Sequence, residues 1–172
     1  MSGPLLWLWA LLALGIGFAA IFVFARRIDN FSIVDVAWSY AFGGIAVFYA
    51  TAGTGWWARR ALMAGLVLAW SLRLGTHLWR RVRSHHPIED GRYGEMRERW
   101  QANLARHMFV FFQFQALSVV VLALPFLFAA ANSEPAFHPF ELAGALVGLV
   151  AWVGESIADA QLARFKRQPG NR

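Results

Sequence analysis

The sequence of 172 residues contains no cysteine, and only 15% of its residues are charged. The absence of cysteine excludes disulfides, thiolate catalysis and cysteine-ligated metal sites. An average soluble domain is about 25% charged and about 45–50% apolar, whereas this chain is 58% hydrophobic. A domain of this size still exposes roughly a third of its surface, so one water-soluble core cannot bury that much apolar surface. The composition therefore excludes an ordinary soluble enzyme and a disordered chain, and it indicates a membrane protein.

Five hydrophobic stretches are long enough to cross a bilayer, which takes about 20 apolar residues in a helix. They cover residues 4–24, 31–51, 61–79, 108–131 and 140–160. The sequence therefore predicts an all-α fold, a polytopic transmembrane helical bundle of about five spans in a single domain over residues 1–172. Its expected partner is the lipid bilayer. Nucleic acid is not expected, although the formal net charge is +6, because the basic residues gather at the ends of the spans.

The positions of the 16 Lys and Arg residues predict the orientation in the membrane. With five spans, most of them follow the first, third and fifth spans and so lie on one side, while Arg59 and Arg60 lie opposite. By the positive-inside rule, the amino terminus is outside and the carboxyl terminus is cytoplasmic. Residues 80–106 then form a cytoplasmic loop. Within it we expect an interfacial amphipathic helix over residues 93–107.

Several polar side chains interrupt the spans, and by this topology all of them lie in the cytoplasmic halves of their helices. An ionisable residue within a bilayer costs several kcal/mol unless it is paired or hydrated, so each is a candidate functional residue. Their shared depth favours a polar pocket that opens to the cytoplasm. The residues are Asp35, Arg73, His77, Gln113, Gln115, Glu155 and Asp159.

Structural explanations stay open for the same side chains. Asp35 could be a carboxylate that faces the positive end of its own helix dipole. Arg73 could pair with an acid such as Asp35 or Glu155 for purely structural reasons. The Gly144-x-x-x-Gly148 spacing predicts the close approach of a neighbouring helix, so the fifth span could be a packing seam. Tyr93 lies in the cytoplasmic loop, where a simple surface turn is the alternative.

Four segments in combination resemble the bacterial steroid 5-alpha-reductase-like membrane proteins, which are often catalogued only as a domain of unknown function. The resemblance extends from about residue 31 over nearly the whole chain. The wider superfamily includes sterol reductases and, more distantly, isoprenylcysteine carboxyl methyltransferases. The segments are NFSIVDVAW at 30–38, WSLRLGTHL at 70–78, EDGRY at 89–93 with MR at 96–97, and GESIADAQLARFK at 154–166.

The resemblance implies an enzyme of the bacterial inner membrane that uses NADPH from the cytoplasmic side to reduce a hydrophobic, unsaturated carbonyl compound. In the steroid reductases, a polar residue, an aspartate four positions later and a basic residue seven positions after that bind the cofactor. Glu155, Asp159 and Lys166 occupy the matching positions here. No cluster has metal-ligand spacing, so no metal is expected.

The catalytic residues expected nearest the reacting carbonyl are Asp35, Arg73 and His77. Arg73 or protonated His77 would donate a hydrogen bond to the carbonyl, and Asp35 would orient the donor. The steroid reductases instead carry a Gln-Glu pair in the second span and a tyrosine in the third, which this chain does not have.

Further helices and an Arg-His-Pro motif follow in the family, beyond the point that corresponds to residue 172. The resemblance therefore implies that this chain is the amino-terminal portion of a longer domain, and leaves open whether it is active alone. Two other functions also stay open: an S-adenosylmethionine-dependent methyltransferase of the isoprenylcysteine type, and a non-enzymatic helical membrane protein. The oligomeric state and the substrate are not predicted.

Overall fold

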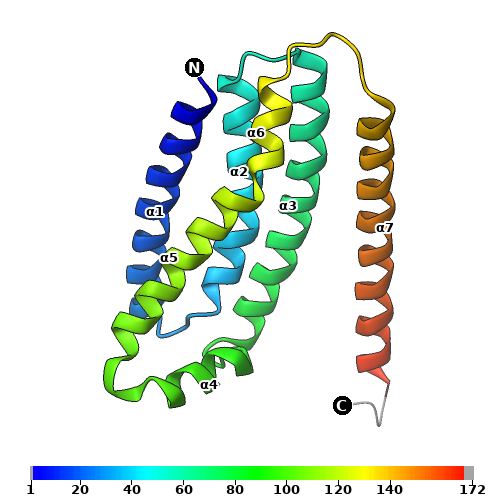
Figure 1. Ribbon diagram of the computed structural model, residues 1–172. Coiled ribbons are helices and arrows are strands. Elements are labelled where there is room, and N and C mark those ends of the chain that lie inside the picture. Colours follow the sequence, from blue (N-terminus) through cyan, green and yellow to red (C-terminus); the bar gives the residue numbers. More distant parts are fainter. Residues whose placement is uncertain (1, 169–172) are drawn as a thin grey trace. The chain divides into compact units, whose positions relative to one another are not determined.

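The computed structural model describes residues 2–168, and every regular element within them is a helix (Figure 1). The elements are α1 (Gly3–Arg27), α2 (Ile33–Ala52), α3 (Trp57–His85), α4 (Gly91–Arg99), a 3₁₀ turn (Gln101–Asn103), α5 (Leu104–Leu122), α6 (Leu124–Ala131) and α7 (Pro139–Arg167). Five helical segments are long and apolar enough to span a membrane: α1, α2, α3, the stretch Gln101–Ala131, and α7. The predicted all-α fold with five spans is confirmed.

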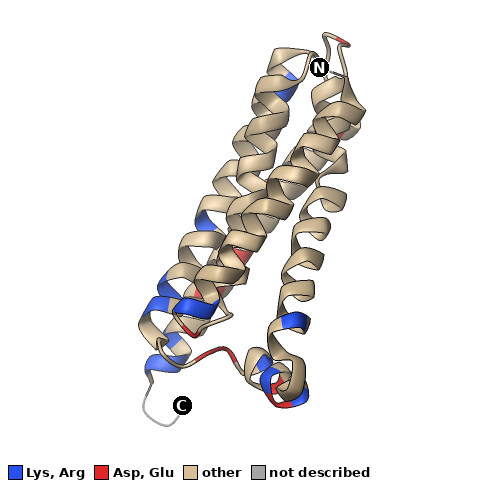
Figure 2. Cartoon of the chain, turned by 90° about the vertical axis from the view of Figure 1, so that its left-hand side faces the viewer, with Lys and Arg blue, Asp and Glu red and all other residues tan. Residues whose placement is uncertain are grey.

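The chain forms two compact units that divide after Ser133. The first unit holds α1 to α6, and the second holds α7. In the first unit, α2 packs mainly on α3, and α1 packs mainly on α5. The short helix α4 lies where α3 ends and α5 begins, close to the loop between α1 and α2 (Figure 1). We call this end of the first unit the charged end, because Lys, Arg, Asp and Glu gather there (Figure 2).

A cluster of phenylalanines closes the core beside the charged end. Phe22 of α1 stacks on Phe31 at a ring-centroid distance of 6.4 Å and meets Phe112 of α5 edge-on at 5.6 Å. Phe112 is fully buried. Large aromatic side chains dominate the energy of such cores, so these contacts hold the loop before α2 against α1 and α5.

A serine hydroxyl joins α2 to α3 in the middle of the first unit. The Oγ of Ser71 donates to the carbonyl of Ser39 at 2.7 Å and accepts from the N–H of Gly43 at 3.1 Å. These two backbone groups are four residues apart, the spacing of a helical hydrogen bond. The Ser71 hydroxyl therefore bridges two groups of α2 that lie one turn apart. The close approach needs Gly43, because a Cβ there would lie 2.6 Å from this hydroxyl.

The fourth span differs from its prediction as one continuous helix over residues 108–131. It is broken at Ala123 into α5 and α6. Pro125 causes the break, because its ring has no N–H and would clash with the carbonyl four residues earlier. The N–H of Phe126 bonds to the carbonyl of Ala123, three residues earlier, at 3.0 Å. The N–H of Leu127 makes the first regular bond of α6, to the same carbonyl at 3.2 Å.

The interfacial helix predicted over residues 93–107 is wrong in its extent. The observed α4 ends at Arg99, and α5 begins at Leu104. Between them, Trp100 leaves the helical conformation and Gln101–Asn103 form a 3₁₀ turn. The chain must change direction there to enter the span, and a single helix could not make that turn.

The opposite end of the first unit is held by backbone bonds and two arginines. The N–H groups of Gly55 and Trp56 donate to the carbonyls of Ala130 and Asn132 at 2.9 and 2.8 Å. Arg59, only 4% exposed, donates to the carbonyl of Asn132 at 3.0 Å, and Arg60 donates to that of Gly53 at 2.9 Å. Arg59 and Arg60 are the arginines on the side of the membrane opposite to most of the basic residues. Their contacts show that they satisfy backbone carbonyls at the ends of helices.

We expect Gly55→Ala to destabilise this end. A Cβ at Gly55 would lie 2.5 Å from the carbonyl oxygen of Asn132, which is backbone and cannot rotate away. Overpacking of this kind costs about 1–3 kcal/mol, so the melting temperature of the purified protein in detergent should fall by several degrees. Gly65→Ala is the matched control, because a Cβ there meets nothing within 4 Å. Equal melting temperatures for the two variants would contradict the expectation.

Candidate functional site at the charged end

The loop between α1 and α2 begins with a helix-ending turn. Asp29 has a positive φ of 49°, and the N–H of Asn30 donates to the carbonyl of Ala25 at 3.0 Å. This is the Schellman arrangement, with aspartate in the left-handed position that glycine usually takes. Asn30 is fully buried, and its Oδ1 accepts from the N–H of Ser32 at 3.0 Å. The loop thus enters α2 in one fixed conformation.

The segment before α4 is bonded to this loop. The carboxylate of Glu89 accepts from the N–H of Phe31, and the N–H of Asp90 donates to the Oγ of Ser32 at 3.0 Å. Both contacts join residues 58 positions apart in the chain. The start of α4 is therefore positioned by the start of α2.

Arg97 forms a second connection between α4 and the loop. Its Nε and Nη2 donate to the two oxygens of Glu89 at 2.6 and 3.0 Å, and Nη2 also donates to Asp29 Oδ1 at 2.9 Å. The guanidinium lies 4.6 Å from the centroid of the Phe31 ring. The hydrogen bond to Glu89 raises the pKa of Arg97 above its ordinary value. Because the Glu89 side chain is only 10% exposed, this two-point pair is a strong contact.

Asp90 caps α4 and pairs with two arginines. Its Oδ1 accepts from the backbone N–H and the Nε of Arg92 at 3.2 and 3.0 Å. Its Oδ2 accepts from Nη2 of Arg81, at the end of α3, at 2.7 Å. The hydrogen bond from Arg92 lowers the pKa of the Asp90 carboxyl below its usual 3.8, although burial acts in the opposite direction. Asp90 therefore stays charged and links α3 to α4.

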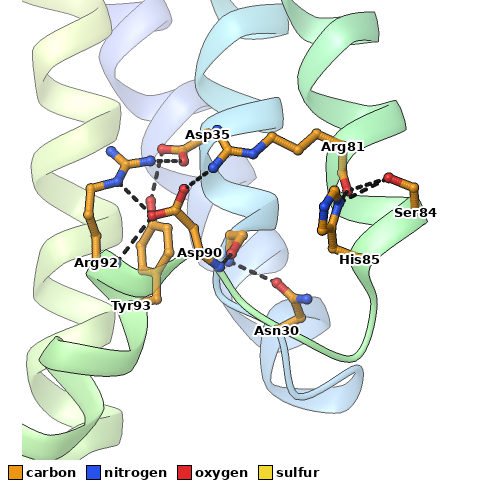
Figure 3. Close-up of polar contacts among 9 residues, drawn as sticks. Asn30, Asp35, Arg81, Ser84, His85, Asp90, Arg92 and Tyr93 are labelled. Carbon is orange, nitrogen blue, oxygen red and sulfur yellow. Dashed lines mark hydrogen bonds and ion pairs between the residues drawn. The ribbon is translucent and has the colours of Figure 1, made fainter. Parts of the chain in front are cut away.

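Asp35 lies in the first turn of α2 and receives two hydrogen bonds from α4 (Figure 3). Arg92 Nη2 donates to Oδ2 and the Tyr93 hydroxyl donates to Oδ1, both at 2.8 Å. Tyr93 is 1% exposed, whereas the Arg92 side chain is 63% exposed. Burial, followed by the negative charge of Asp35, raises the pKa of the Tyr93 phenol well above its ordinary 10. The phenol is thus a protonated donor held by a carboxylate.

Among the residues predicted as catalytic, only Asp35 belongs to this hydrogen-bonded cluster as the structure describes it. Arg73 and His77 lie one turn apart on α3, about half a turn around the helix from Ser71 and Gly75, which face α2. Gln113 of α5 faces α1, where a Cβ at Gly15 would meet its Oε1 at 3.7 Å. The predicted polar residues of the first unit therefore share one half of the bundle but occupy different faces of their helices.

The residues predicted to bind a cofactor lie on α7, in the second unit. Glu155 and Asp159 are partly buried, and Lys166 in the last turn is exposed. Intervals of four and seven residues put all three on one face of the helix, over a length of about 16 Å. The predicted packing glycines of α7, Gly144 and Gly148, are exposed, and a Cβ at either meets no described atom within 4 Å. Neither glycine therefore mediates close helix packing inside this unit.

The sequence suggested Arg73 as a possible partner of Asp35, but the structure pairs Asp35 with Arg92 and Tyr93. Arg92 and Tyr93 follow Asp90, and an aspartate before a short polar helix is a recognisable N-cap signal. That signal locates the start of α4 but not the element on which α4 packs. A buried tyrosine in a polar loop has no periodicity that would distinguish it from an exposed one.

Comparisons with known proteins give one match. The profile of a family described as "Protein of unknown function (DUF1295)" matches residues 21–172. No curated protein and no solved structure matches the chain.

Proposed function

The chain belongs to the DUF1295 family of proteins of unknown function, and from that premise we propose that it is a membrane-embedded, NADPH-dependent reductase of lipid-soluble unsaturated carbonyl compounds. The observation that carries the proposal is the buried phenol of Tyr93, bonded to Asp35 beside Arg92. Reduction of an enone needs a donor that polarises the carbonyl oxygen, and a phenol of raised pKa keeps its proton for that role.

The residues of the cluster then have distinct tasks. In the structure Tyr93 donates its one hydroxyl proton to Asp35. When substrate binds, the hydroxyl turns and donates this proton in a hydrogen bond to the carbonyl oxygen instead. Asp35 holds the hydroxyl in place before the substrate binds, and Arg92 holds the Asp35 carboxylate through the 2.8 Å ion pair. The sequence also offers Arg73 and His77 as donors, and they remain the competing assignment.

The side chains of α7 fit a dinucleotide in their chemistry. The carboxylates of Glu155 and Asp159 accept hydrogen bonds from ribose hydroxyls or a carboxamide, and Lys166 attracts a phosphate. Their shared face suits an elongated ligand that lies along the helix. NADPH, when bound, would supply a hydride to the β carbon of the substrate.

We expect Asp159→Ala to weaken NADPH binding by at least about tenfold, because a charge-assisted hydrogen bond contributes about 1.5–3 kcal/mol. Binding can be measured on the full chain in detergent as energy transfer from tryptophan to the reduced nicotinamide. Trp152 is a suitable donor, since it lies one turn before Glu155 on α7. Lys166→Ala should lower the affinity for NADPH more than that for NADH, since only NADPH carries the additional phosphate.

Glu141→Gln is the matched control, because Glu141 is an acid of the same helix that serves its capping box. Wild-type affinity in Asp159→Ala and Lys166→Ala would contradict the cofactor assignment. Displacement of NADPH by S-adenosylmethionine at lower concentration would favour the methyltransferase instead. Binding of neither compound would favour a non-enzymatic role.

A further inference from the structure

An apolar groove runs along the interface of α1 and α2, on the outside of the first unit. It consists of two cavities of about 580 and 330 Å³, which share Leu14 and Ala41 in their walls. The first reaches Phe24 and Trp79 near the charged end, and the second reaches Trp9 at the other end. From residue 9 to residue 24 the groove follows α1 for about 22 Å.

The shape of the groove comes from small residues between large ones. Ala13, Gly17 and Gly44 leave space along its length, and Trp9 and Trp79 stand at its two ends. The polar side-chain groups in its walls are the Tyr40 hydroxyl, which bonds to Thr76 at 3.0 Å, and the indole N–H groups of the two tryptophans at its ends. Any polar group in the groove would therefore lose its hydrogen bonds to water without replacement. A hydrocarbon chain has no such groups.

The groove is separate from the cluster around Asp35. The residues of α2 that line it include Ile33, Val36 and Tyr40. At about 100° per residue, Asp35 points about 180° away from the centre of this face. Occupation of the groove therefore requires no change at the proposed catalytic residues.

Two arginines stand beyond the charged end of the groove. Arg27 follows Phe24 by three residues on α1, and Arg83 follows Trp79 by four residues on α3, so each continues an edge of the groove by one turn. Both are exposed. Within residues 2–168 neither has an acidic partner, whereas Arg81, Arg92 and Arg97 are all in ion pairs.

From this charge complementarity we propose that the groove binds one anionic phospholipid. A single acyl chain lies along α1 and α2, and the phosphate meets Arg27 and Arg83 at the membrane surface. The length agrees, since one leaflet of a bilayer is about 15 Å of hydrocarbon and a chain of that extent fits within the groove. A tryptophan, Trp79, lines the groove at the charged end, and this residue type is enriched at the level of the headgroups.

The test is native mass spectrometry of the full chain released from mixed vesicles of phosphatidylglycerol and phosphatidylcholine. We expect one retained phosphatidylglycerol per chain in the wild type. Each of Arg27→Ala and Arg83→Ala should lower this retention by about fivefold relative to phosphatidylcholine. Each of the single variants Arg99→Ala and Arg106→Ala removes the same charge away from the groove and should keep the wild-type preference.

A variant that fills the groove distinguishes binding of the acyl chain from electrostatic attraction of the lipid headgroup. Gly17→Leu places a side chain in the groove where a Cβ meets nothing within 4 Å, so the variant should fold and lose retention of both lipids. Gly65→Leu is the matched control on α3, with the same open space outside the groove. Equal retention of the two lipids by the wild type, or unchanged retention in Gly17→Leu, would overturn the proposal. A dimer mass for the wild type and a monomer mass for Gly17→Leu would also overturn it, because the groove would then bind a second copy of the protein.

Discussion

Replacement of Arg97 by methionine should lower the free energy of unfolding by about 3 kcal/mol, the largest stability effect that we expect from a single side chain of α4. The substitution keeps the aliphatic stem but leaves the Glu89 carboxylate, which is 10% exposed, without its two-point partner. It also removes the guanidinium from Asp29 and from the face of Phe31. Unfolding can be followed by tryptophan fluorescence during thermal and denaturant titrations in detergent.

A double-mutant cycle measures the interaction energy between Arg97 and Glu89. Glu89→Gln keeps an acceptor for the N–H of Phe31 and should cost less than Arg97→Met. The double variant should then be more stable than the sum of the single effects predicts, because no uncompensated charge is left in the site. Arg99→Met, two residues further along α4 and exposed, is the matched control. Additive effects across the cycle would mean that Arg97 acts by packing alone.

Replacement of Tyr93 by phenylalanine should lower kcat by about 100-fold or more, with NADPH affinity unchanged, because a positioned proton donor contributes about 10²–10⁴-fold. The assay is oxidation of NADPH by the full chain in membrane vesicles supplied with a linear long-chain enone. Asp35→Asn should have a smaller effect on kcat, since it alters the direction of the hydroxyl but not its presence. Since the pKa of Tyr93 is raised, its titration should not limit the rate at neutral pH.

Tyr40→Phe is the control for this second prediction. Tyr40 also donates or accepts through its hydroxyl, but its partner is Thr76 of α3 and not the Asp35 cluster. Its kcat should match that of the wild type. If Tyr93→Phe retains activity while Arg73→Met or His77→Gln loses it, the donor belongs to α3 and the original sequence-based assignment is right.

The spans could be predicted because hydrocarbon imposes a simple requirement on sequence. Each crossing needs about 20 apolar residues, and the five stretches stand out from the segments that join them. The break before α6 could also have been recognised, since Pro125 cannot continue a helix without losing a bond. The end of α4 could not, because Trp100 and Gln101 carry no strong stop signal and the change of direction depends on where α5 must start.

The partners of Asp35 could not be predicted from the sequence for a different reason. Asp35 and Tyr93 are 58 residues apart, and no local pattern relates one to the other. Their meeting depends on Ser32, Glu89 and Asp90, which hold the start of α4 against the start of α2. Polarity within a span indicated that Asp35 needed a partner, and Arg73 was the candidate because it is the basic residue inside a span.

The two hydrogen bonds of Ser71 to the backbone of α2 have a mechanical consequence. Sliding α2 past α3 by even one residue would strip the Ser39 carbonyl and the Gly43 amide of their shared bond in a setting without water. We therefore expect α2 and α3 to move together as one rigid hairpin. A displacement of α3 near Arg81 would then be accompanied by a displacement of the turn around Gly53, at the other end of the hairpin.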